Sequence, residues 1–549
     1  MKVSHLQVTK SPVEVRHAAV TAGHPLGAAV GAAVLRRGGN AVDAAVATAF
    51  AMAVVEPFMS CLAGGGSMLI HRPRRGESVA LDFNVEAPAA AHARMYPPGG
   101  GQGSDLFPWR AVEGDANVHG HRAVAVPGSL AGLALALERY GTLDLRDAVA
   151  PAVRLARRGV PVDWYLALAT AEHAEELSGY PEAARTYLRD GRWAPRPPSL
   201  GPGDRWRQPA LARTLELIGK EGPDVFYRGE LAEAIVAEMR RGGGILTRED
   251  LAAYRARVAA PLGGTYRGVR LLGMPGATGC ATALQALNVL GCFDLPRDDA
   301  GGARTYHLRA GAFRLAFADR LRWLGDPAHV DAPWDLLLAP AHAAGLARRL
   351  GARTRRERRR PPRGGDCTTH VGAVDRDRTL VSLTHTAVSL FGSRVVVPGT
   401  GLLLSNGMMW FDPEPGRANS IAPRKRALVN MTPFLALRDD RPWLTVGAPG
   451  GRKIVTAVPQ VLSNLIDFGL APQAACEAPR LHAEDETVYV DDRVGGRVLA
   501  ALRRLGHRVV PQTESFSTFF FARPQVIEVR GDRLVAGVDH LRPATAMGF

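Results

Sequence analysis

Short stretches of β-branched or alternating residues take turns along the chain with longer stretches whose apolar residues recur at helical spacing. Helical spacing covers 28–55, with a break at Gly38-Gly39-Asn40, and returns at 129–174 and 211–241. Further helices are expected from 245 (with Thr247 as N-cap) and over 278–291, 307–322, 340–350 and 454–469, and strands at 67–70, 79–83, 266–273, 443–446, 488–490, 519–521 and 526–529. This alternation predicts a mixed α/β protein.

The clearest strand pattern lies at 368–386. Residues 368–374 are β-branched, small or alternating, Asp375 to Arg378 form a polar turn, and 379–386 repeat the strand pattern. The pattern predicts an antiparallel hairpin that starts at Thr368, directly after Cys367 and a basic, proline-bearing run at 355–363. A Thr that opens a buried strand after a flexible segment is typical of an N-terminal-nucleophile (Ntn) enzyme. Such a chain cleaves itself before the Thr, whose hydroxyl becomes the nucleophile and whose freed α-amine becomes its base.

Composition indicates an ordinary globular protein with a large core: 549 residues, 46% hydrophobic and 22% charged. No run reaches the roughly 18 apolar residues of a membrane span, and charges interrupt the first twenty residues, so we expect neither a membrane segment nor a signal peptide. The five cysteines show no metal-ligand spacing, and their odd number fits a reduced compartment. We therefore expect a cytoplasmic protein without metal or cofactor. The cysteines are Cys61, Cys280, Cys292, Cys367 and Cys476.

The net charge of +15 raises the question of nucleic-acid binding. The basic residues are almost all Arg and are spread along helices, and their one dense cluster, 355–363, is expected to be a flexible tail. The glycines Gly64 to Gly66 lack the following Lys-Ser/Thr of a phosphate loop and the dinucleotide fingerprint. We expect no nucleic-acid partner and interpret these glycines as a place of close backbone approach.

The hairpin motifs TTH, SLTHT and VVVPGTGLLLSN resemble the start of the small subunit of γ-glutamyltranspeptidases. The run HPLGAAVGAAVLRRGGNAVDAAVATAFAMAVVEP and LAGGGSML resemble the opening of that family's large subunit. Further matches follow in the family's order to the C-terminus: AVAVPGSLAGL, LTREDLAAY, TYRG, FADR with LGDP, GAPGGRKI, APRLH and LGHRVV. The resemblance covers nearly the whole chain from about residue 17.

The resemblance implies the four-layer αββα sandwich of the Ntn-hydrolases, shared by two autoprocessed pieces, 1–367 and 368–549, that stay associated. It implies cleavage between Cys367 and Thr368, with Thr368 as nucleophile. Thr386 matches the threonine that hydrogen-bonds the nucleophile. Gly450 and Gly451 match the glycines whose backbone amides stabilise the oxyanion.

The match breaks where the family binds glutamate. The arginine that grips the α-carboxylate is replaced by Asn84, and an asparagine two residues after the second threonine is replaced by Val388. The acidic pair, one member of which binds the α-ammonium, is replaced by Met409-Trp410. The remaining candidate substrate contacts are Asn406 and the pair Val429-Asn430, which stands where the family has Ser-Ser. The family's polar residue two places before the acidic pair is replaced by Gly407.

A γ-glutamyl site must pair one carboxylate and one ammonium, and a desolvated zwitterion without these partners loses several kcal/mol. We therefore expect a flatter, more apolar small-molecule substrate. The family includes a branch from actinobacterial antibiotic pathways that make 4-alkyl-proline units. Its members are implicated in hydrolysing a carbon–carbon bond beside a ketone, and this sequence fits that branch. Three alternatives stay open: an amide acylase of the cephalosporin-acylase type, glutathione hydrolysis with replacement contacts from Arg394 or Arg424, and an uncleaved scaffold protein.

Overall fold

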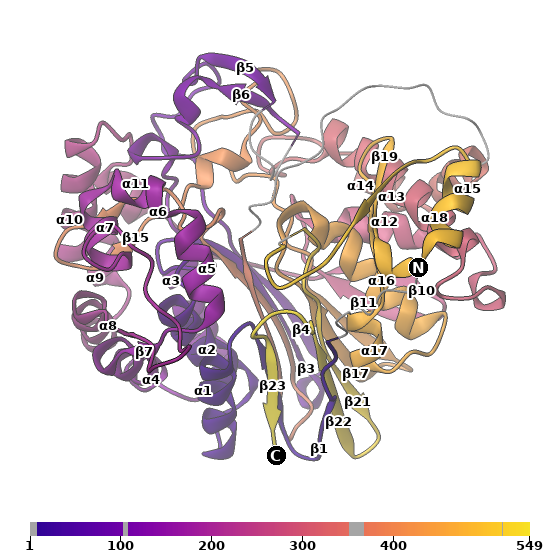
Figure 1. The fold of residues 1–549 in the computed structure, drawn as a ribbon, viewed down its shortest axis with the longest axis horizontal. Coiled ribbons are helices and arrows are strands. Elements are labelled where there is room, and N and C mark those ends of the chain that lie inside the picture. Colours follow the sequence, from indigo (N-terminus) through magenta and orange to yellow (C-terminus); the bar gives the residue numbers. More distant parts are fainter. Residues whose placement is uncertain (1–7, 103–107, 351–366, 519) are drawn as a thin grey trace.

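Two antiparallel sheets of seven strands each lie face to face at the centre of the molecule (Figure 1). The computed structural model describes residues 8–102, 108–350, 367–518 and 520–549. The first sheet has the order β1 (Val13–Val15), β22 (Arg533–Val538), β21 (Gln525–Arg530), β17 (Arg441–Gly447), β16 (Phe434–Arg438), β11 (Val269–Gly273), β10 (Leu262–Tyr266). The second has the order β23 (Thr545–Gly548), β2 (Ala19–Ala22), β12 (Thr369–Val374), β13 (Leu380–Thr386), β3 (Gly65–Arg72), β4 (Glu77–Phe83), β9 (Arg257–Ala259).

Helices cover the outer face of each sheet, on opposite sides of the molecule (Figure 1). One set shares a core with the second sheet: α1 (Pro25–Arg36), α2 (Ala41–Val55), α3 (Ser129–Tyr140), α4 (Leu145–Arg158), α8 (Pro209–Glu221) and α10 (Glu230–Arg241). The other packs on the first sheet: α12 (Gly279–Gly291), α13 (Ala303–Trp323), α15 (Pro340–Arg349), α16 (Ile454–Ile466), α17 (Pro472–Glu477) and α18 (Gly496–Arg504). The predicted αββα sandwich is confirmed.

Polar residues begin the helices where the sequence predicts. Asn40 caps α2 in a reciprocal arrangement with Asp43, which separates α1 from α2. Thr247 and Asp250 form the same capping box at α11 (Arg248–Ala253), and the Thr278 side chain caps α12. Because each cap satisfies amides that have no partner within the helix, these boundaries follow from local sequence.

One strand prediction begins too early, and another is wrong. The stretch 266–273 is the turn and second strand of a hairpin, because Arg267 and Gly268 have φ of 51° and 80° and join β10 to β11 as a two-residue loop. Phe520 and Phe521 belong to no strand and instead pack with Tyr489 in a small apolar cluster; Phe519 and the basic run 355–363 lie outside the described residues. None of the described helices has the length and hydrophobicity that a bilayer crossing needs.

The hairpin β12–β13 is confirmed and lies in the middle of the second sheet, between β2 and β3. Gly64 and Gly66 allow the close approach expected of the glycine run. A Cβ on Gly64 would lie 2.1 Å from the Thr386 carbonyl oxygen, and one on Gly66 would lie 2.5 Å from that of Thr384. The glycines therefore let the chain pack tightly against the strand that ends in Thr386.

Candidate active site

Thr368 and Thr386 meet at the open end of the hairpin. The register pairs Thr369 with His385, so the preceding and following residues, Thr368 and Thr386, lie opposite each other. Their hydroxyl oxygens are 3.3 Å apart, and both side chains are buried. The Thr368 hydroxyl also donates to the Cys367 carbonyl oxygen, and the Thr386 hydroxyl accepts from the Val388 amide at 2.9 Å. The hydroxyl of Thr368 is therefore directed at the peptide group that precedes it.

A loop that follows α2 holds the chain around Cys367. The Cys367 thiol donates to the carbonyl oxygens of Phe58 at 3.0 Å and Met59 at 2.7 Å. The Met59 carbonyl also accepts from the Ala387 amide at 3.1 Å, so one loop is tied to both ends of the hairpin. Burial raises the pKa of the Cys367 thiol, which keeps it protonated and unreactive.

Glu56, the first residue of this loop, is a buried carboxyl near Thr369. One carboxyl oxygen and the Thr369 hydroxyl both lie within 3.3 Å of the point where a Cβ on Gly23 would stand. Burial raises the Glu56 pKa to about 7, an effect that nearby His24 opposes and Asp163 reinforces. Apart from its place before Pro57, Glu56 carries no sequence signal of a role here, and only the fold brings it to this position.

Gly450 and Gly451 follow β17 at the same end of the sandwich as Thr368. β17 ends at Gly447, where a Cβ would lie 2.2 Å from the ring of His370 in β12. Gly450 and Gly451 have φ of 137° and 53°, and a Cβ on Gly450 would lie 2.4 Å from Ala522 Cα. Gly450 therefore requires glycine, and both glycines stand where the loop enters the short helix η6 (Gly451–Lys453) and then α16, the kind of helix start that can bind an anion.

The apolar residues predicted to line the substrate site come together. Val388, Trp410 and Val429 belong to one buried cluster. The same cluster contains Val85, Trp109, Met408, Met409, Phe411 and Leu428. Segments far apart in sequence thus form one apolar cluster next to the residues that follow Thr386.

The three candidate asparagines are engaged by the protein. Asn84 donates to the Ala427 carbonyl at 3.1 Å. Asn406 accepts from the Ser389 amide at 3.1 Å and donates to the Ser389 hydroxyl at 2.7 Å. Asn430 accepts from Arg320 at 3.0 Å. These side chains shape the loops around the apolar cluster.

Arg320 was missed in the sequence, although it stands in the FADR phrase. Its guanidinium is buried and donates to the carbonyl oxygens of Thr278 at 2.8 Å and Val429 at 2.7 Å, besides Asn430. Burial lowers its pKa to about 9. Arg320 thus fixes the 429–430 segment from behind, which a one-dimensional reading of FADR does not reveal.

The two arginines proposed as substitute carboxylate partners are placed differently. Arg394 is buried, and its guanidinium pairs with Glu176 and donates to the Gly392 carbonyl at 2.6 Å. Arg424 is exposed on the surface. The charge of Arg394 already has a protein partner, and Arg424 faces solvent.

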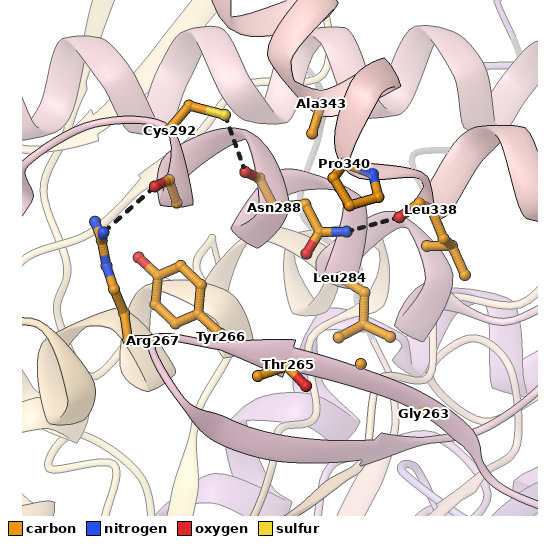
Figure 2. A pocket seen from close by; sticks show the side chains of 12 residues that line it. Gly263, Thr265, Tyr266, Arg267, Leu284, Asn288, Cys292, Leu338, Pro340 and Ala343 are labelled. Atoms are coloured by element: carbon orange, nitrogen blue, oxygen red, sulfur yellow. Dashed lines mark hydrogen bonds between the residues drawn. The ribbon is translucent and has the colours of Figure 1, made fainter.

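A cavity of about 540 Å³ lies elsewhere, between the edge strand β10 and helices α12 and α15 (Figure 2). Tyr266 and Arg267 line one end, and Leu338 and Pro340 the other. None of its lining residues belongs to the hairpin or to the glycine loop. Among the described residues, no group of three or more His, Cys, Asp or Glu side chains is placed to hold a metal ion.

Comparisons with known proteins match nearly the whole chain. The family model for gamma-glutamyltranspeptidase matches residues 27–549. The chain is 37% identical over 512 residues to the acylase ACY 1 proenzyme of Pseudomonas sp. (strain SE83), covering 93% of this chain and 90% of that protein. It is also 37% identical over 527 residues to the glutathione hydrolase proenzyme of Escherichia coli (strain K12), covering 92% and 88%.

Solved structures agree over the full length. The crystal structure of cephalosporin acylase from Bacillus halodurans has a TM-score of 0.87 at 29% identity and covers 100% of this chain and 99% of that one. A structure of LmbA2991HD has a TM-score of 0.81 at 26% identity, covering 99% and 100%. The sandwich, with a threonine at the start of a central strand, defines an Ntn-hydrolase.

Within that class, the chain belongs to the γ-glutamyltranspeptidase family. It is therefore an enzyme of the hydrolase and acyltransferase type that this family comprises, and the predicted family and fold are confirmed.

Proposed function

We propose that the protein cleaves itself between Cys367 and Thr368 and then hydrolyses a non-glutamyl small molecule with a bulky apolar acyl group. In the first step the Thr368 hydroxyl adds to the Cys367 carbonyl carbon, the C–N bond breaks, and the hydroxyl proton ends on the new α-amine. Water opens the resulting ester. The 3.3 Å contact between the Thr368 and Thr386 hydroxyls, and the contact of Thr368 with the Cys367 carbonyl, support this step.

In the mature enzyme the α-amine of Thr368 takes the hydroxyl proton as the oxygen attacks the substrate carbonyl. The Gly450 and Gly451 amides stabilise the tetrahedral oxyanion; losing one such donor in other enzymes costs about 2.7–4 kcal/mol. The leaving group departs with a proton, and water releases the acyl group from Thr368.

One observation carries the substrate proposal: Val388, Trp410 and Val429 share a single buried apolar cluster. A carboxylate and an ammonium placed against this cluster would be desolvated without partners, since Arg394 is paired with Glu176. A planar or apolar acyl group has no charge to desolvate there, and burial of its apolar surface is favourable. We therefore propose a biosynthetic step that breaks a carbon–carbon bond beside a ketone. The leaving group is a carbanion that an electron-accepting ring stabilises.

A second candidate is an amide acylase, in which an amine leaves instead. The full-length likeness to a cephalosporin acylase structure favours it. Both candidates use the same acyl-Thr368 intermediate, and they differ only in the bond that breaks.

The test is a denaturing gel followed by substrate panels read by intact-protein mass spectrometry. Wild-type protein is expected to give two bands that match 1–367 and 368–549, and Thr368→Ala one band. Acyl adducts on the 368–549 piece are expected from bulky aryl ketones or acyl amides. The proposal is refuted if Thr368→Ala still splits at the same bond, or if a γ-glutamyl anilide is turned over as well as the best apolar donor.

A further inference from the structure

A buried ion pair stands directly behind the glycine loop. Arg452 follows Gly451 in the chain, and its side chain is 2% exposed. Its guanidinium Nη1 lies 2.8 Å from Glu484 Oε1, and the Glu484 side chain is 9% exposed. Burial by itself would raise the Glu484 pKa, but Arg452, His482 and Lys453 outweigh it and lower the pKa to about 2. The carboxylate is therefore ionised at neutral pH.

A second connection runs from Glu484 to the first turn of α16. His482 ends the strand β18 (Leu481–His482), and its Nε2 lies 3.6 Å from Glu484 Oε2. The other ring nitrogen, Nδ1, lies 3.0 Å from the Thr456 hydroxyl in α16. Glu484 is thus linked to the segment after the glycines through Arg452 and through the His482–Thr456 contact.

The charges explain why a carboxylate is needed here. Arg452 and Lys453 place two cations at the start of α16, where the helix dipole already presents positive charge. The buried Arg320 of α13 also interacts with Glu484. Glu484 is therefore an anion close to three buried cations, and its removal would take away the ion pair that compensates the burial of Arg452.

The glycines themselves cannot lock the loop. Gly450 and Gly451 adopt positive φ that other residues avoid, and glycine has the greatest backbone freedom. An oxyanion hole works only if its donors are fixed before the reaction, since a displacement of about 1 Å can cost on the order of 10²-fold in rate.

We propose that the Arg452–Glu484 pair is a positioning element that holds the Gly450 and Gly451 amides in place for acylation of Thr368. This inference rests on the proposed roles of Thr368 and the two glycines. Neither Arg452 nor Glu484 touches the reacting atoms; they act through the glycine loop.

The test measures acylation of the self-cleaved enzyme by 4-nitrophenyl acetate, with the rate divided by the number of sites that form an adduct. Glu484→Gln is expected to lower kcat by about 10-fold or more with KM within about 2-fold. Arg452→Lys keeps the charge pair and is expected to retain most of the rate. The inference is overturned if folded Glu484→Gln has the wild-type kcat.

Asp467 offers a matched control at the other end of α16. It is a buried carboxylate 3.0 Å from Arg267 Nε, remote from the glycine loop. Asp467→Asn is expected to lower the melting temperature without changing kcat per site. If Asp467→Asn lowers kcat as much as Glu484→Gln, the effect is general destabilisation and the inference falls.

Two further variants keep the outcome unambiguous. If Glu484→Gln does not fold, the double variant Arg452→Met with Glu484→Leu leaves neither partner unpaired, and it is expected to fold with a similar loss of kcat. A wild-type kcat in the double variant overturns the inference. Thr368→Ala is expected to be inert, and if it reacts as fast as wild type, the proposed nucleophile is wrong. If Thr368→Ala is inert but Glu484→Gln has the wild-type kcat, only the positioning role is refuted.

Discussion

Replacing Glu56 by Gln is expected to stabilise the protein above pH 7 and to have little effect below pH 5. Glu56 is 3% exposed, and its environment holds the proton on the carboxyl because burial disfavours the charge more than His24 and Arg523 favour it. Gln is close in size to the protonated carboxyl and never ionises. The substitution therefore removes a titration with almost no change in volume.

The magnitude follows from the shift of the Glu56 pKa from 4.5 to about 7. At about 1.36 kcal/mol per unit, ionised Glu56 costs the folded state about 3 kcal/mol relative to the unfolded chain. Because the folded pKa is the higher one, the folded state binds the extra proton. Stability from this group is fully present below pH 4.5 and is lost as the pH rises through 7.

The assay compares melting temperatures of wild type, Glu56→Gln and the surface control Glu138→Gln from pH 4.5 to 8.5. With an unfolding entropy of roughly 2.1 cal/mol/K per residue, 3 kcal/mol corresponds to about 3 °C for a chain of this length. Glu56→Gln should exceed wild type by about that amount at pH 8.5 and equal it at pH 4.5. A difference that is independent of pH, or one shared by Glu138→Gln, would refute the reasoning.

Three substitutions test the site itself. Thr386→Val removes the 3.3 Å contact with the Thr368 hydroxyl and leaves the buried Val388 amide without its acceptor, so self-cleavage followed on a gel should slow by about 10²-fold, with Thr386→Ser close to wild type. Gly450→Ala places a methyl group 2.4 Å from Ala522 Cα at a φ of 137° and should cost about 2–4 kcal/mol in denaturant unfolding; unchanged stability would contradict the packing described. Cys367→Ala removes two thiol hydrogen bonds but no reacting atom, so self-cleavage should persist within about 10-fold, and complete loss would make the thiol part of the chemistry.

Local sequence signals sufficed where one short stretch determines the structure. The hairpin 368–386 and the capped helix starts at Asn40, Thr247 and Thr278 follow from residue type and spacing, and the fold follows from their order and the family resemblance. The strand expected at 266–273 begins only at Val269, because Arg267 and Gly268 form the turn that precedes it.

Contacts between residues far apart in the chain could not be predicted from the sequence. Glu56 lies near Thr369, Arg320 binds the Val429 carbonyl, and Glu484 pairs with Arg452 only because separate elements pack together. Each of these residues is a charged group whose burial could not be inferred from its neighbours in the chain, since isolated Glu and Arg are ordinarily exposed.

The geometry explains how chemistry and specificity can change independently in this enzyme. The proposed nucleophile, Thr368, and its partner Thr386 lie on one hairpin, and its register places their hydroxyl oxygens 3.3 Å apart. The apolar cluster is instead assembled from Val388, Trp410 and Val429 on separate loops. On the proposed function, substitutions in those loops would alter which acyl group is desolvated but leave the hairpin register intact, because none of the three residues contributes to the β12–β13 pairing. The proposed loss of the charged partners of a zwitterionic donor is therefore compatible with an unchanged reaction at Thr368.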